Sequence, residues 1–215
     1  KTRQVLSYVG NAPTTQKHQK DVDVIDKPRS TGSILKPFLY AAMLDSGELL
    51  PNTLVADIPT NFGSYQPENF DKKYAGAISA KLALSKSLNV PTVRMLQSFG
   101  LEKFHHYLQK LKLKNIKNNP DYYGLTLALG GAESNLWDLC KSYASLASTV
   151  NHYSENSSRY FKNEFVEPTF YADKKIDFGE KTPEKIIFDA ASVYLAFESL
   201  KEVNRPNSDQ NWEFF

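Results

Sequence analysis

The chain has 215 residues, enough for a domain with a sizeable core, and its 41% hydrophobic and 23% charged residues are ordinary for a soluble globular protein. Its formal net charge of +2 gives no electrostatic reason to expect binding to nucleic acid or to a membrane surface. No stretch approaches the roughly 18 apolar residues of a membrane span. The single cysteine, Cys140, excludes an internal disulfide.

The N-terminal part of the chain predicts two short strands. Residues 4–9 (Gln-Val-Leu-Ser-Tyr-Val) form an apolar run closed by Gly-Asn, and residues 22–25 (Val-Asp-Val-Ile) form another. A ribbon of two strands is rarely stable alone, so we expect partner strands from sequence outside this chain. The chain also begins without Met and ends on an apolar Trp-Glu-Phe-Phe, and we therefore expect it to be a piece of a longer protein.

A helix is predicted to begin at Ser33. Residues 30–33 (Ser-Thr-Gly-Ser) are a start signal, residues 33–44 are rich in apolar side chains, and the Asp-Ser-Gly at residues 45–47 is a stop signal. Pro37 fits this helix only in its first turn, where a missing backbone N–H costs little. This reasoning places Ser33 at the N-terminus of the helix.

The rest of the chain is predicted to be mainly helical. Residues 51–72, rich in proline and asparagine, predict a loop with little regular structure, and residues 75–99 predict a helical region interrupted at residues 89–91 (Asn-Val-Pro). The apolar spacing around Cys140 predicts a helix with the thiol buried in its core face. Further helices are predicted over residues 101–111 and 186–197. The fold class expected is therefore α+β and mostly helical.

One Ser-x-x-Lys pattern is present, at Ser33 and Lys36. Residues three apart share a helix face, so the hydroxyl and the amine can reach hydrogen-bonding distance. A serine hydroxyl needs a base beside it to become a nucleophile, and a lysine can be that base if burial or a helix N-terminus lowers its pKa. The backbone N–H of Ser33 could also point at a developing oxyanion. The pair is therefore a candidate nucleophile and base.

The spacing alone is weak evidence, because a chain of this length should contain roughly one Ser-x-x-Lys by chance. Its ordinary interpretation is an N-cap serine followed by a surface lysine. A second element is Ser87-Leu88-Asn89, in a helical region broken off by Val90-Pro91. Such a break lets the two polar side chains turn into a cleft, where Ser87 could relay a proton and Asn89 could bind a substrate amide.

Four segments around these motifs carry a family resemblance. They are residues 29–40 (Arg-Ser-Thr-Gly-Ser-Ile-Leu-Lys-Pro-Phe-Leu-Tyr), 65–71 (Tyr-Gln-Pro-Glu-Asn-Phe-Asp), 85–94 (Ser-Lys-Ser-Leu-Asn-Val-Pro-Thr-Val-Arg) and 124–133 (Gly-Leu-Thr-Leu-Ala-Leu-Gly-Gly-Ala-Glu). The first three resemble the nucleophile helix, the connecting segment and the second motif of class A (bifunctional) penicillin-binding proteins, and the fourth is similar to the 1C branch. The resemblance spans about residues 4–150. It implies that residues 1–215 are a partial transpeptidase domain with the penicillin-binding protein and serine β-lactamase-like fold.

The resemblance implies the reaction and its partners. Ser33 would attack the D-Ala-D-Ala carbonyl of a peptidoglycan stem peptide, release the last D-alanine and leave an acyl-enzyme, which an amine of a neighbouring stem peptide would resolve as a cross-link. Lys36 would act as base, Ser87 as proton relay and Asn89 as ligand for the substrate backbone. β-Lactams would trap Ser33, and no metal or organic cofactor is implied. The parent would be membrane-anchored, at the periplasm or outer face of the inner membrane, and would work with other cell-wall synthesis proteins.

The family's third motif, Lys-Thr/Ser-Gly on a sheet strand, is absent from this chain. Lys181-Thr182-Pro183 imitates it, but proline cannot donate along a strand and the segment precedes a predicted helix. In the family that strand binds the substrate carboxylate and supplies the second oxyanion donor. We therefore expect an incomplete sheet, and weak or no activity from this fragment alone. The upstream glycosyltransferase domain and membrane anchor are also expected to be missing.

Two alternative functions stay open at this point. A serine β-lactamase or D,D-carboxypeptidase shares the Ser-x-x-Lys logic but should lack the segments at residues 65–71 and 127–133. A non-catalytic penicillin-binding sensor or scaffold is the other, and the intact Ser and Lys of the first motif and Ser and Asn of the second argue against such decay.

Overall fold

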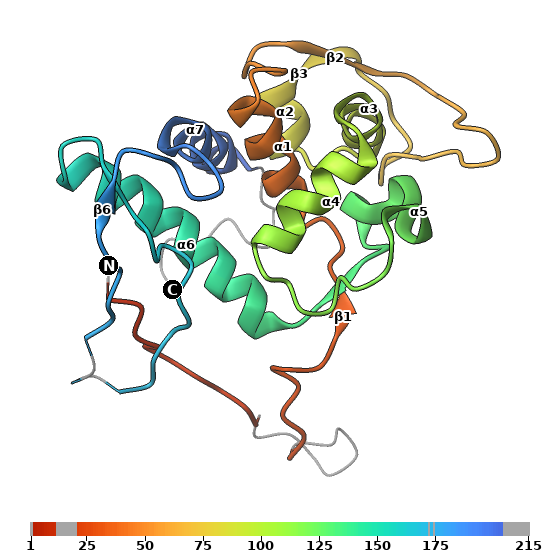
Figure 1. Cartoon of the computed structure of the whole chain (residues 1–215). Helices are drawn as coiled ribbons and strands as arrows, with labels where there is room; N and C mark the ends of the chain where they lie inside the picture. The colour runs from red at the N-terminus through yellow and green to blue at the C-terminus, as the bar shows by residue number, and fades with distance from the viewer. Residues whose placement is uncertain (1, 12–20, 172, 174, 204–215) are drawn as a thin grey trace.

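The computed structural model describes residues 2–11, 21–171, 173 and 175–203. It is a mixed fold dominated by helix, as the sequence predicted, and it is shown in Figure 1. No described helix combines the length and the hydropathy that a bilayer span needs. The described helices and strands, in chain order, are β1 (Arg29–Ser30), α1 (Lys36–Asp45), β2 (Leu54–Asp57), β3 (Gly76–Ser79), α2 (Ala80–Ser85), α3 (Asn89–Phe99), α4 (Leu101–Lys110), α5 (Pro120–Tyr123), the 3-10 helix η2 (Gly124–Leu129), β4 (Glu133–Ser134), α6 (Leu136–Glu155), β5 (Tyr160–Phe161), β6 (Lys181–Thr182) and α7 (Ala190–Lys201).

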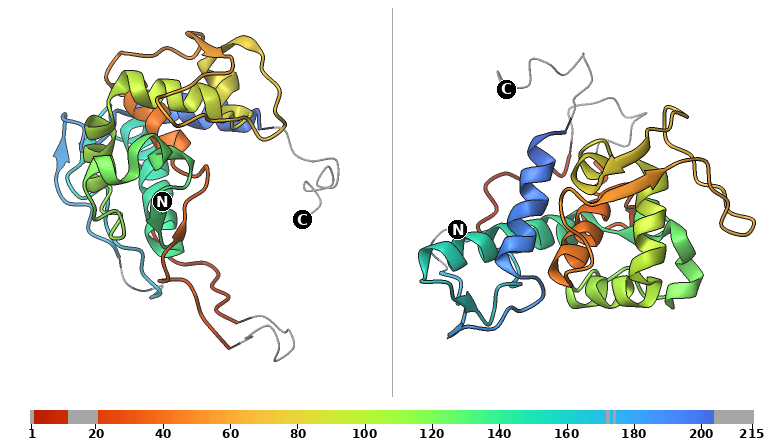
Figure 2. Two further views of the ribbon diagram at one scale, coloured as in Figure 1. Left: turned by 90° about the vertical axis from the view of Figure 1, so that its right-hand side faces the viewer. Right: turned by 90° about the horizontal axis from the view of Figure 1, so that it is seen from above.

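The helix α1 is the centre of the fold. Its residues from Lys36 to Met43 are all buried, because α2, α3, α4 and α7 pack around it. Figure 1 and the view from above in Figure 2 show these helices on different sides of α1, with the long α6 running past its N-terminal end. A helix covered on every side is expected to be apolar all round. Lys36 is the exception in α1, and its buried amine therefore needs polar partners.

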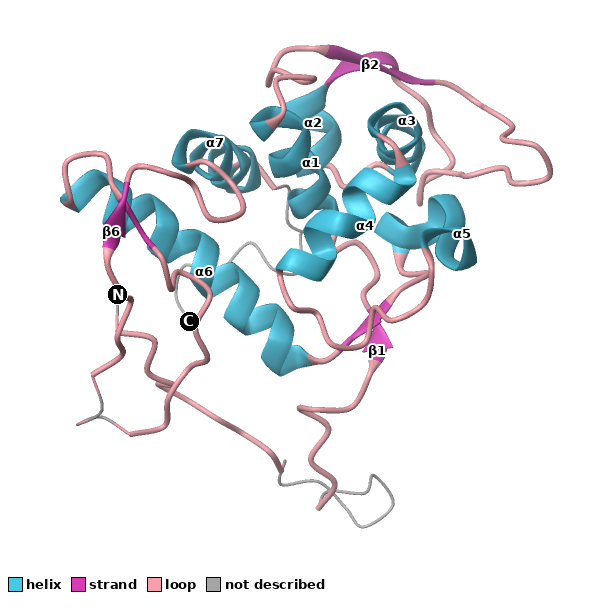
Figure 3. Ribbon diagram, viewed as in Figure 1, coloured by secondary structure: helices cyan, strands magenta, loops and turns pink. Residues whose placement is uncertain are grey.

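The strands are short and pair in twos, β1 with β4, β2 with β3 and β5 with β6, all antiparallel. The strands predicted over residues 4–9 and 22–25 are not formed: within the described part of the chain, Gln4 makes a single parallel bridge to Thr169, and residues 22–25 join no ladder. Both segments are drawn as loops in Figure 3. A strand needs a neighbour for its backbone groups, and these two segments find almost none.

The β2–β3 hairpin corrects two other predictions. Val55 and Ile78 face each other in this ladder, although residues 51–72 were predicted to be a loop and residues 75–99 to be helical. Helix therefore starts at Ala80, after β3, and not at residue 75. The ladder joins residues 19 to 25 positions apart, and Gly76–Ser79 contains one residue with a strand preference, Ile78.

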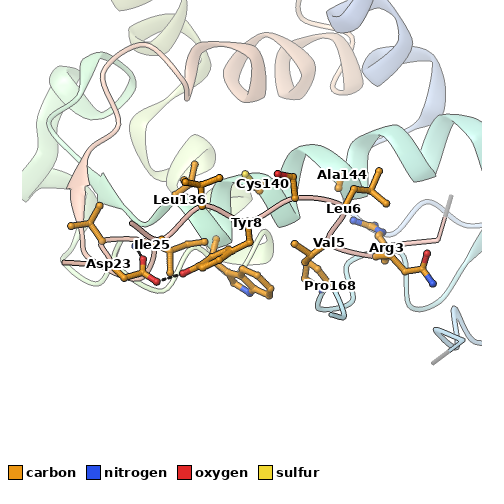
Figure 4. Close-up of a pocket in the computed structure, with 16 residues that line it drawn as sticks. Arg3, Val5, Leu6, Tyr8, Asp23, Ile25, Leu136, Cys140, Ala144 and Pro168 are labelled. Atoms are coloured by element: carbon orange, nitrogen blue, oxygen red, sulfur yellow. Dashed lines mark hydrogen bonds between the residues drawn. The ribbon is translucent and has the colours of Figure 1, made fainter. Parts of the chain in front are cut away.

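The prediction that Cys140 is buried is wrong, because the thiol-bearing residue is exposed. Leu136, Cys140 and Ala144 follow one another at spacings of four along α6, and this face lines a cavity of about 450 Å³ against the N-terminal residues 3–10 (Figure 4). The opposite face of α6 buries hydroxyls such as Ser142 and Ser145, which donate to the carbonyls four residues earlier at 2.8 Å. Hydroxyls that are satisfied in this way cost little to bury.

Candidate active site

Ser33 lies in an exposed turn immediately before α1. Its carbonyl accepts from the Lys36 N–H at 3.1 Å, and the Ile34 N–H donates to the Thr31 carbonyl at 3.0 Å. The predicted helix start was wrong by three residues, because α1 begins at Lys36. In a continuous α-helix the ring of Pro37 would clash with the carbonyl four residues earlier, which is that of Ser33. The serine is therefore presented on a tight turn and not on the helix itself.

The segment before Ser33 is fastened to the segment that follows η2. Ser30 Oγ donates to the Gly130 carbonyl at 2.8 Å, and both the N–H and the hydroxyl of Thr31 donate to the Ala132 carbonyl at 3.1 Å. Gly130 has a φ of +101°, and a Cβ there would lie 2.6 Å from Ser30 Oγ and 3.0 Å from Gly32 Cα. Only glycine fits here without displacing the turn that carries Ser33. This gives a physical reason for the glycine at residue 130.

Tyr143 of α6 supports the other side of the same turn. Its hydroxyl donates to the Ile34 carbonyl at 2.7 Å, and its ring lies 4.8 Å from that of Phe38 in α1. Burial raises the pKa of the Tyr143 phenol above its usual range, so the phenol stays a hydrogen-bond donor. Ser33 is thus held between β1 on one side and α6 on the other.

Lys36 connects α1 to the second motif. The side chain is 3% exposed, and its Nζ lies 2.6 Å from the Ser87 carbonyl oxygen, 3.2 Å from Ser87 Oγ and 2.8 Å from Asn89 Oδ1. An ammonium has three N–H donors, and all three are used. Burial lowers the pKa of Lys36 from an ordinary 10.5 to about 8. The lysine is therefore a buried amine poised to lose its proton near neutral pH.

Ser87 adopts a backbone conformation that is unusual for serine. Its φ is +52°. Its N–H donates to the Leu84 carbonyl at 2.8 Å, and the Leu88 N–H donates to the Ala83 carbonyl at 3.0 Å, which together form a Schellman cap at the end of α2. The position that Ser87 occupies in this cap normally holds glycine. A strained residue whose carbonyl and hydroxyl oxygens both accept from Lys36 is a strong indicator of function.

Asn89 is the first residue of α3. Its Oδ1 accepts from Lys36, and its Nδ2 donates to the Glu68 carbonyl at 2.8 Å. The Asn89 backbone N–H donates to Asn69 Oδ1 at 3.0 Å. The side chain of Asn89 is therefore held from two directions, with one N–H and one lone pair left over for a further partner.

The structure thus brings together three of the four predicted site residues, Lys36, Ser87 and Asn89. Among the described residues, no hydrogen bond joins the Ser33 hydroxyl to the Lys36 amine, whose donors all point at the second motif. Catalytic hydrogen bonds are often long in the unliganded state and tighten with substrate. No cluster of His, Cys, Asp and Glu within the described part of the chain could hold a metal ion.

Sequence reasoning missed Asn69 and Asp57 as residues of the site. Asn69 is 2% exposed and Asp57 is 1% exposed, and the two side chains are bonded at 2.7 Å. The one available signal for Asn69 was its place in the segment 65–71, which resembles the family's connecting segment. Nothing in the sequence around Asp57, at the end of β2, marks it as polar and buried.

Residues 1–205 match the protein family described as the penicillin binding protein transpeptidase domain. The chain belongs to this family. Among curated relatives, it is 40% identical over 126 residues to penicillin-binding protein 1C of Escherichia coli (strain K12). This alignment covers 59% of this chain and 16% of that protein. It is 28% identical over 204 residues to penicillin-binding protein 1F of Bacillus subtilis (strain 168), in an alignment that covers 94% of this chain and 27% of that protein. The predicted class A, 1C-type resemblance is confirmed.

A solved structure shows the same fold. Penicillin-binding protein 1A from Haemophilus influenzae matches with a TM-score of 0.64 at 21% identity, over 86% of this chain and 31% of that chain. This transpeptidase domain therefore has the predicted fold, and the chain spans between a sixth and a third of the proteins that it matches. The geometry above joins Lys36 to Ser87 and Asn89, while Ser33 is linked to them by its place in the chain three residues before Lys36.

Lys181 and Thr182, which imitate the third motif, lie away from the site. They form β6, which pairs with β5, and the Lys181 amine lies 5.8 Å from the centre of the Phe161 ring. Figure 1 shows β6 near one end of α6 and β1 near the other. The 20 residues of α6 correspond to a length of about 30 Å. The two-residue strand ends at Thr182, directly before Pro183, which has no N–H to donate to a ladder.

Proposed function

We propose that this domain is the nucleophile-bearing part of a peptidoglycan D,D-transpeptidase. In this proposal Ser33 attacks the carbonyl of the penultimate D-alanine in a stem peptide ending in D-Ala-D-Ala. The terminal D-alanine leaves, an ester joins the rest of the peptide to Ser33, and an amine of a neighbouring stem peptide displaces the serine to form the cross-link. The proposal is supported by the membership of the chain in the transpeptidase family.

The observation that carries the proposal is the buried contact of Lys36 with the second motif. Three hydrogen bonds of 2.6 to 3.2 Å fix its amine beside Ser87 and Asn89, next to the turn that carries Ser33. With a pKa of about 8, about one molecule in ten has a neutral Lys36 at pH 7. A neutral amine donates two of these bonds and offers a lone pair, so it can accept a proton.

Proton transfers then follow from the donors and acceptors at hand. Neutral Lys36 takes the proton of the Ser33 hydroxyl as the serine oxygen bonds to the substrate carbonyl carbon. The resulting ammonium passes a proton through Ser87 Oγ, 3.2 Å from Nζ, to the departing amine of D-alanine. The same groups work in reverse when the acceptor amine attacks the ester. The remaining N–H of Asn89 is free to bind a substrate carbonyl oxygen.

We further propose that the working protein is longer than this chain. A Lys-Thr/Ser-Gly strand would complete the cleft, so the chain alone would be weakly active or inactive. The partners of the whole protein would be peptidoglycan stem peptides, β-lactams and other cell-wall synthesis proteins, and it would act, membrane-anchored, at the periplasm or outer face of the inner membrane. No metal or organic cofactor takes part in this scheme.

A fluorescent penicillin tests this function. The full-length protein should be labelled once per chain, the Ser33→Ala variant should not be labelled, and the present chain alone should be labelled far more slowly. A label that survives in Ser33→Ala contradicts the proposal, and fast stoichiometric labelling of this chain contradicts its predicted weakness. The lifetime of the adduct separates a transpeptidase from a β-lactamase, because a β-lactamase must release the acyl group quickly.

A further inference from the structure

The N-terminus of α3 is capped by a residue from another part of the chain. Leu88 precedes α3 and supplies no side-chain cap. Asn69 Oδ1 instead accepts from the N–H groups of Asn89 at 3.0 Å and Val90 at 3.2 Å. The next residue is Pro91, which has no N–H. One amide oxygen thus accepts from the N–H groups at the start of α3 that have no partner within the helix. Ser, Thr, Asp or Asn usually fills this role from the position before the helix.

Asp57 fixes the orientation of that amide. An ionised carboxylate only accepts, so the Asn69 amide must turn its Nδ2 toward Asp57 Oδ1, which lies 2.7 Å away. The second Nδ2 proton goes to the Lys73 carbonyl at 2.8 Å. A reversed amide would place an oxygen against the carboxylate and an NH₂ group against the N–H donors of α3. The Asp57 carboxylate also accepts from the Ala75 N–H at 2.8 Å.

Asp57 is an unusual side chain to bury merely as a hydrogen-bond acceptor for the Asn69 amide. It is 1% exposed, and within the described part of the chain its hydrogen-bond donors are an amide side chain and a backbone N–H, with no salt bridge. A buried carboxylate without a cation is costly unless hydrogen bonds compensate it. A neutral acceptor could have bonded to Asn69 Nδ2 at lower cost. The carboxylate supplies something further, which is a single allowed orientation of Asn69.

The same segment holds the side chain of Asn89. The carbonyl of Glu68 accepts from Asn89 Nδ2 at 2.8 Å, while the adjacent Asn69 accepts from the Asn89 backbone N–H. With both held, Asn89 Oδ1 points at Lys36 Nζ at 2.8 Å. Residues 68 and 69 therefore set where Asn89 lies, and Asn89 in turn takes one of the three donors of Lys36.

We infer that Asp57 and Asn69 are positioning residues of the acylation site, which act by locking the α3 N-terminus and Asn89 in the arrangement that receives Lys36. The side chains of Asp57 and Asn69 hydrogen-bond to each other, to the N-terminus of α3 and to the backbone of residues 73 and 75. Since neither side chain bonds to Lys36, each acts on Lys36 through Asn89. The inference rests on the proposed function, because it assigns the pair to the reaction that Lys36 and Ser33 carry out. It adds two residues to the site, one of them a buried acid that takes no part in proton transfer.

An exchange of the two side chains tests this role. Asn69→Asp keeps an acceptor for α3 but sets two buried carboxylates against each other. Asp57→Asn removes the charge that orients Asn69. The double variant Asp57→Asn/Asn69→Asp restores one acid and one amide with the hydrogen bond reversed, and the new carboxylate at position 69 would still accept from α3. Its one remaining defect is at the Lys73 carbonyl, which loses the donor that it has in wild type. Asn61→Asp, at an exposed position of the connection between β2 and β3, is the matched control.

Two readouts on the full-length protein follow each variant. The first is β-lactam acylation, resolved into a binding constant and an acylation rate constant, under conditions where every variant is folded. A misplaced site residue can slow reaction about 100-fold. We expect Asn69→Asp to slow acylation at least about 10-fold, Asp57→Asn to slow it several-fold, and the double variant to be acylated at least about threefold faster than Asn69→Asp, with binding little changed. The second is backbone hydrogen exchange of a peptide covering residues 88–96, which should quicken in the single variants and recover in the double variant.

The outcomes separate the inference from the function beneath it. If wild type is acylated at Ser33 but both single variants are acylated equally fast, or the double variant is no better than the worse single variant, the positioning role is wrong and the proposed function stands. If only exchange changes while acylation does not, the pair merely stabilises α3 and the inference is again overturned. If wild type is not acylated at all, the proposed function fails, and the inference fails with it.

Discussion

Replacement of Ser87 by glycine or by alanine separates the backbone strain at this position from the contribution of its hydroxyl. Ser87 stands at the glycine position of the Schellman cap with a φ of +52°. A left-handed conformation costs a residue with a Cβ roughly 1–2 kcal/mol, which Ser87→Gly removes. Glycine also makes the unfolded chain more flexible, which takes back about 0.4–1 kcal/mol. These two backbone effects together favour Ser87→Gly by about 0–1.6 kcal/mol. Glycine also loses the 3.2 Å hydrogen bond between Ser87 Oγ and Lys36 Nζ, which takes back about 0.5–1.5 kcal/mol, so its stability should lie within about 1.5 kcal/mol of wild type.

Ser87→Ala is the matched comparison. Alanine keeps the cost of the left-handed conformation and loses the 3.2 Å hydrogen bond between Oγ and Lys36 Nζ, so it should be about 0.5–1.5 kcal/mol less stable than wild type. Because both variants lose this hydrogen bond, it cancels between them, and the Gly variant should be about 0–1.6 kcal/mol more stable than the Ala variant. Both variants keep the carbonyl at residue 87 that accepts from Lys36 at 2.6 Å, but both lose the hydroxyl that we propose as the proton relay.

Urea unfolding of the chain measures the stabilities, and β-lactam acylation of the full-length protein measures the reaction. Loss of a proton relay should slow acylation about 100-fold to 10,000-fold in both variants. The Gly variant should thus be at least as stable as the Ala variant, and both variants should be far less reactive than wild type. A Gly variant that is less stable than the Ala variant would refute the left-handed cap. A Gly variant that acylates at the wild-type rate would refute the role of the Ser87 hydroxyl.

The remaining predictions concern Lys36, Gly130 and Cys140. Burial lowers the pKa of Lys36 to about 8 in the folded chain, against 10.5 in the unfolded one, so between these values the unfolded state holds the extra proton and the free energy of unfolding rises with pH. Lys36→Met should remove this rise, which is at most about 3 kcal/mol. An unfolding free energy from urea that depends on pH equally in wild type and in Lys36→Met would contradict it. The wild-type acylation rate should increase with pH around 8, and a flat profile would argue against a titrating base. Gly130→Ala should cost about 1–3 kcal/mol and slow acylation, because its Cβ would lie 2.6 Å from Ser30 Oγ at a φ of +101°; unchanged unfolding would contradict the close crossing. Cys140 should react fully with a maleimide in the native chain, since it is exposed, and labelling only after unfolding would refute its exposure.

The local motifs of the site could be predicted from the sequence, and the long-range supports could not. Ser33 with Lys36, and Ser87 with Asn89, are each close in the chain, and a break at Pro91 indicated that the second pair leaves the helix. Asn69 caps a helix that begins 20 residues later, and no local pattern connects it to Asn89. The β2–β3 hairpin was missed for the same reason, since its ladder is fixed by pairing between distant segments.

Cys140 shows a different limit of sequence reasoning. Apolar spacing placed Leu136 and Cys140 in the core, but α6 buries its hydroxyl-bearing face instead. Ser142 and Ser145 satisfy their own hydroxyls within the helix, so the usual penalty for burying polar groups is small there. Hydrophobicity alone could not tell which face of such a helix is covered. The start of α1 was a smaller error, and it could have been avoided by applying the steric rule for Pro37 to the carbonyl of Ser33.

Peptide mapping of the full-length protein after reaction with a β-lactam tests the central claim most directly, that Ser33 is the nucleophile and Lys36 its base. Trypsin does not cut between Lys36 and Pro37, so Ser33 lies in a fragment of residues 30–72 that also contains Ser30, Ser46 and Ser64. Fragmentation by mass spectrometry should place one adduct per chain on Ser33, and Lys36→Met should abolish it while the protein stays folded. An adduct on any of the other three serines, or an undiminished adduct in Lys36→Met, would contradict the claim.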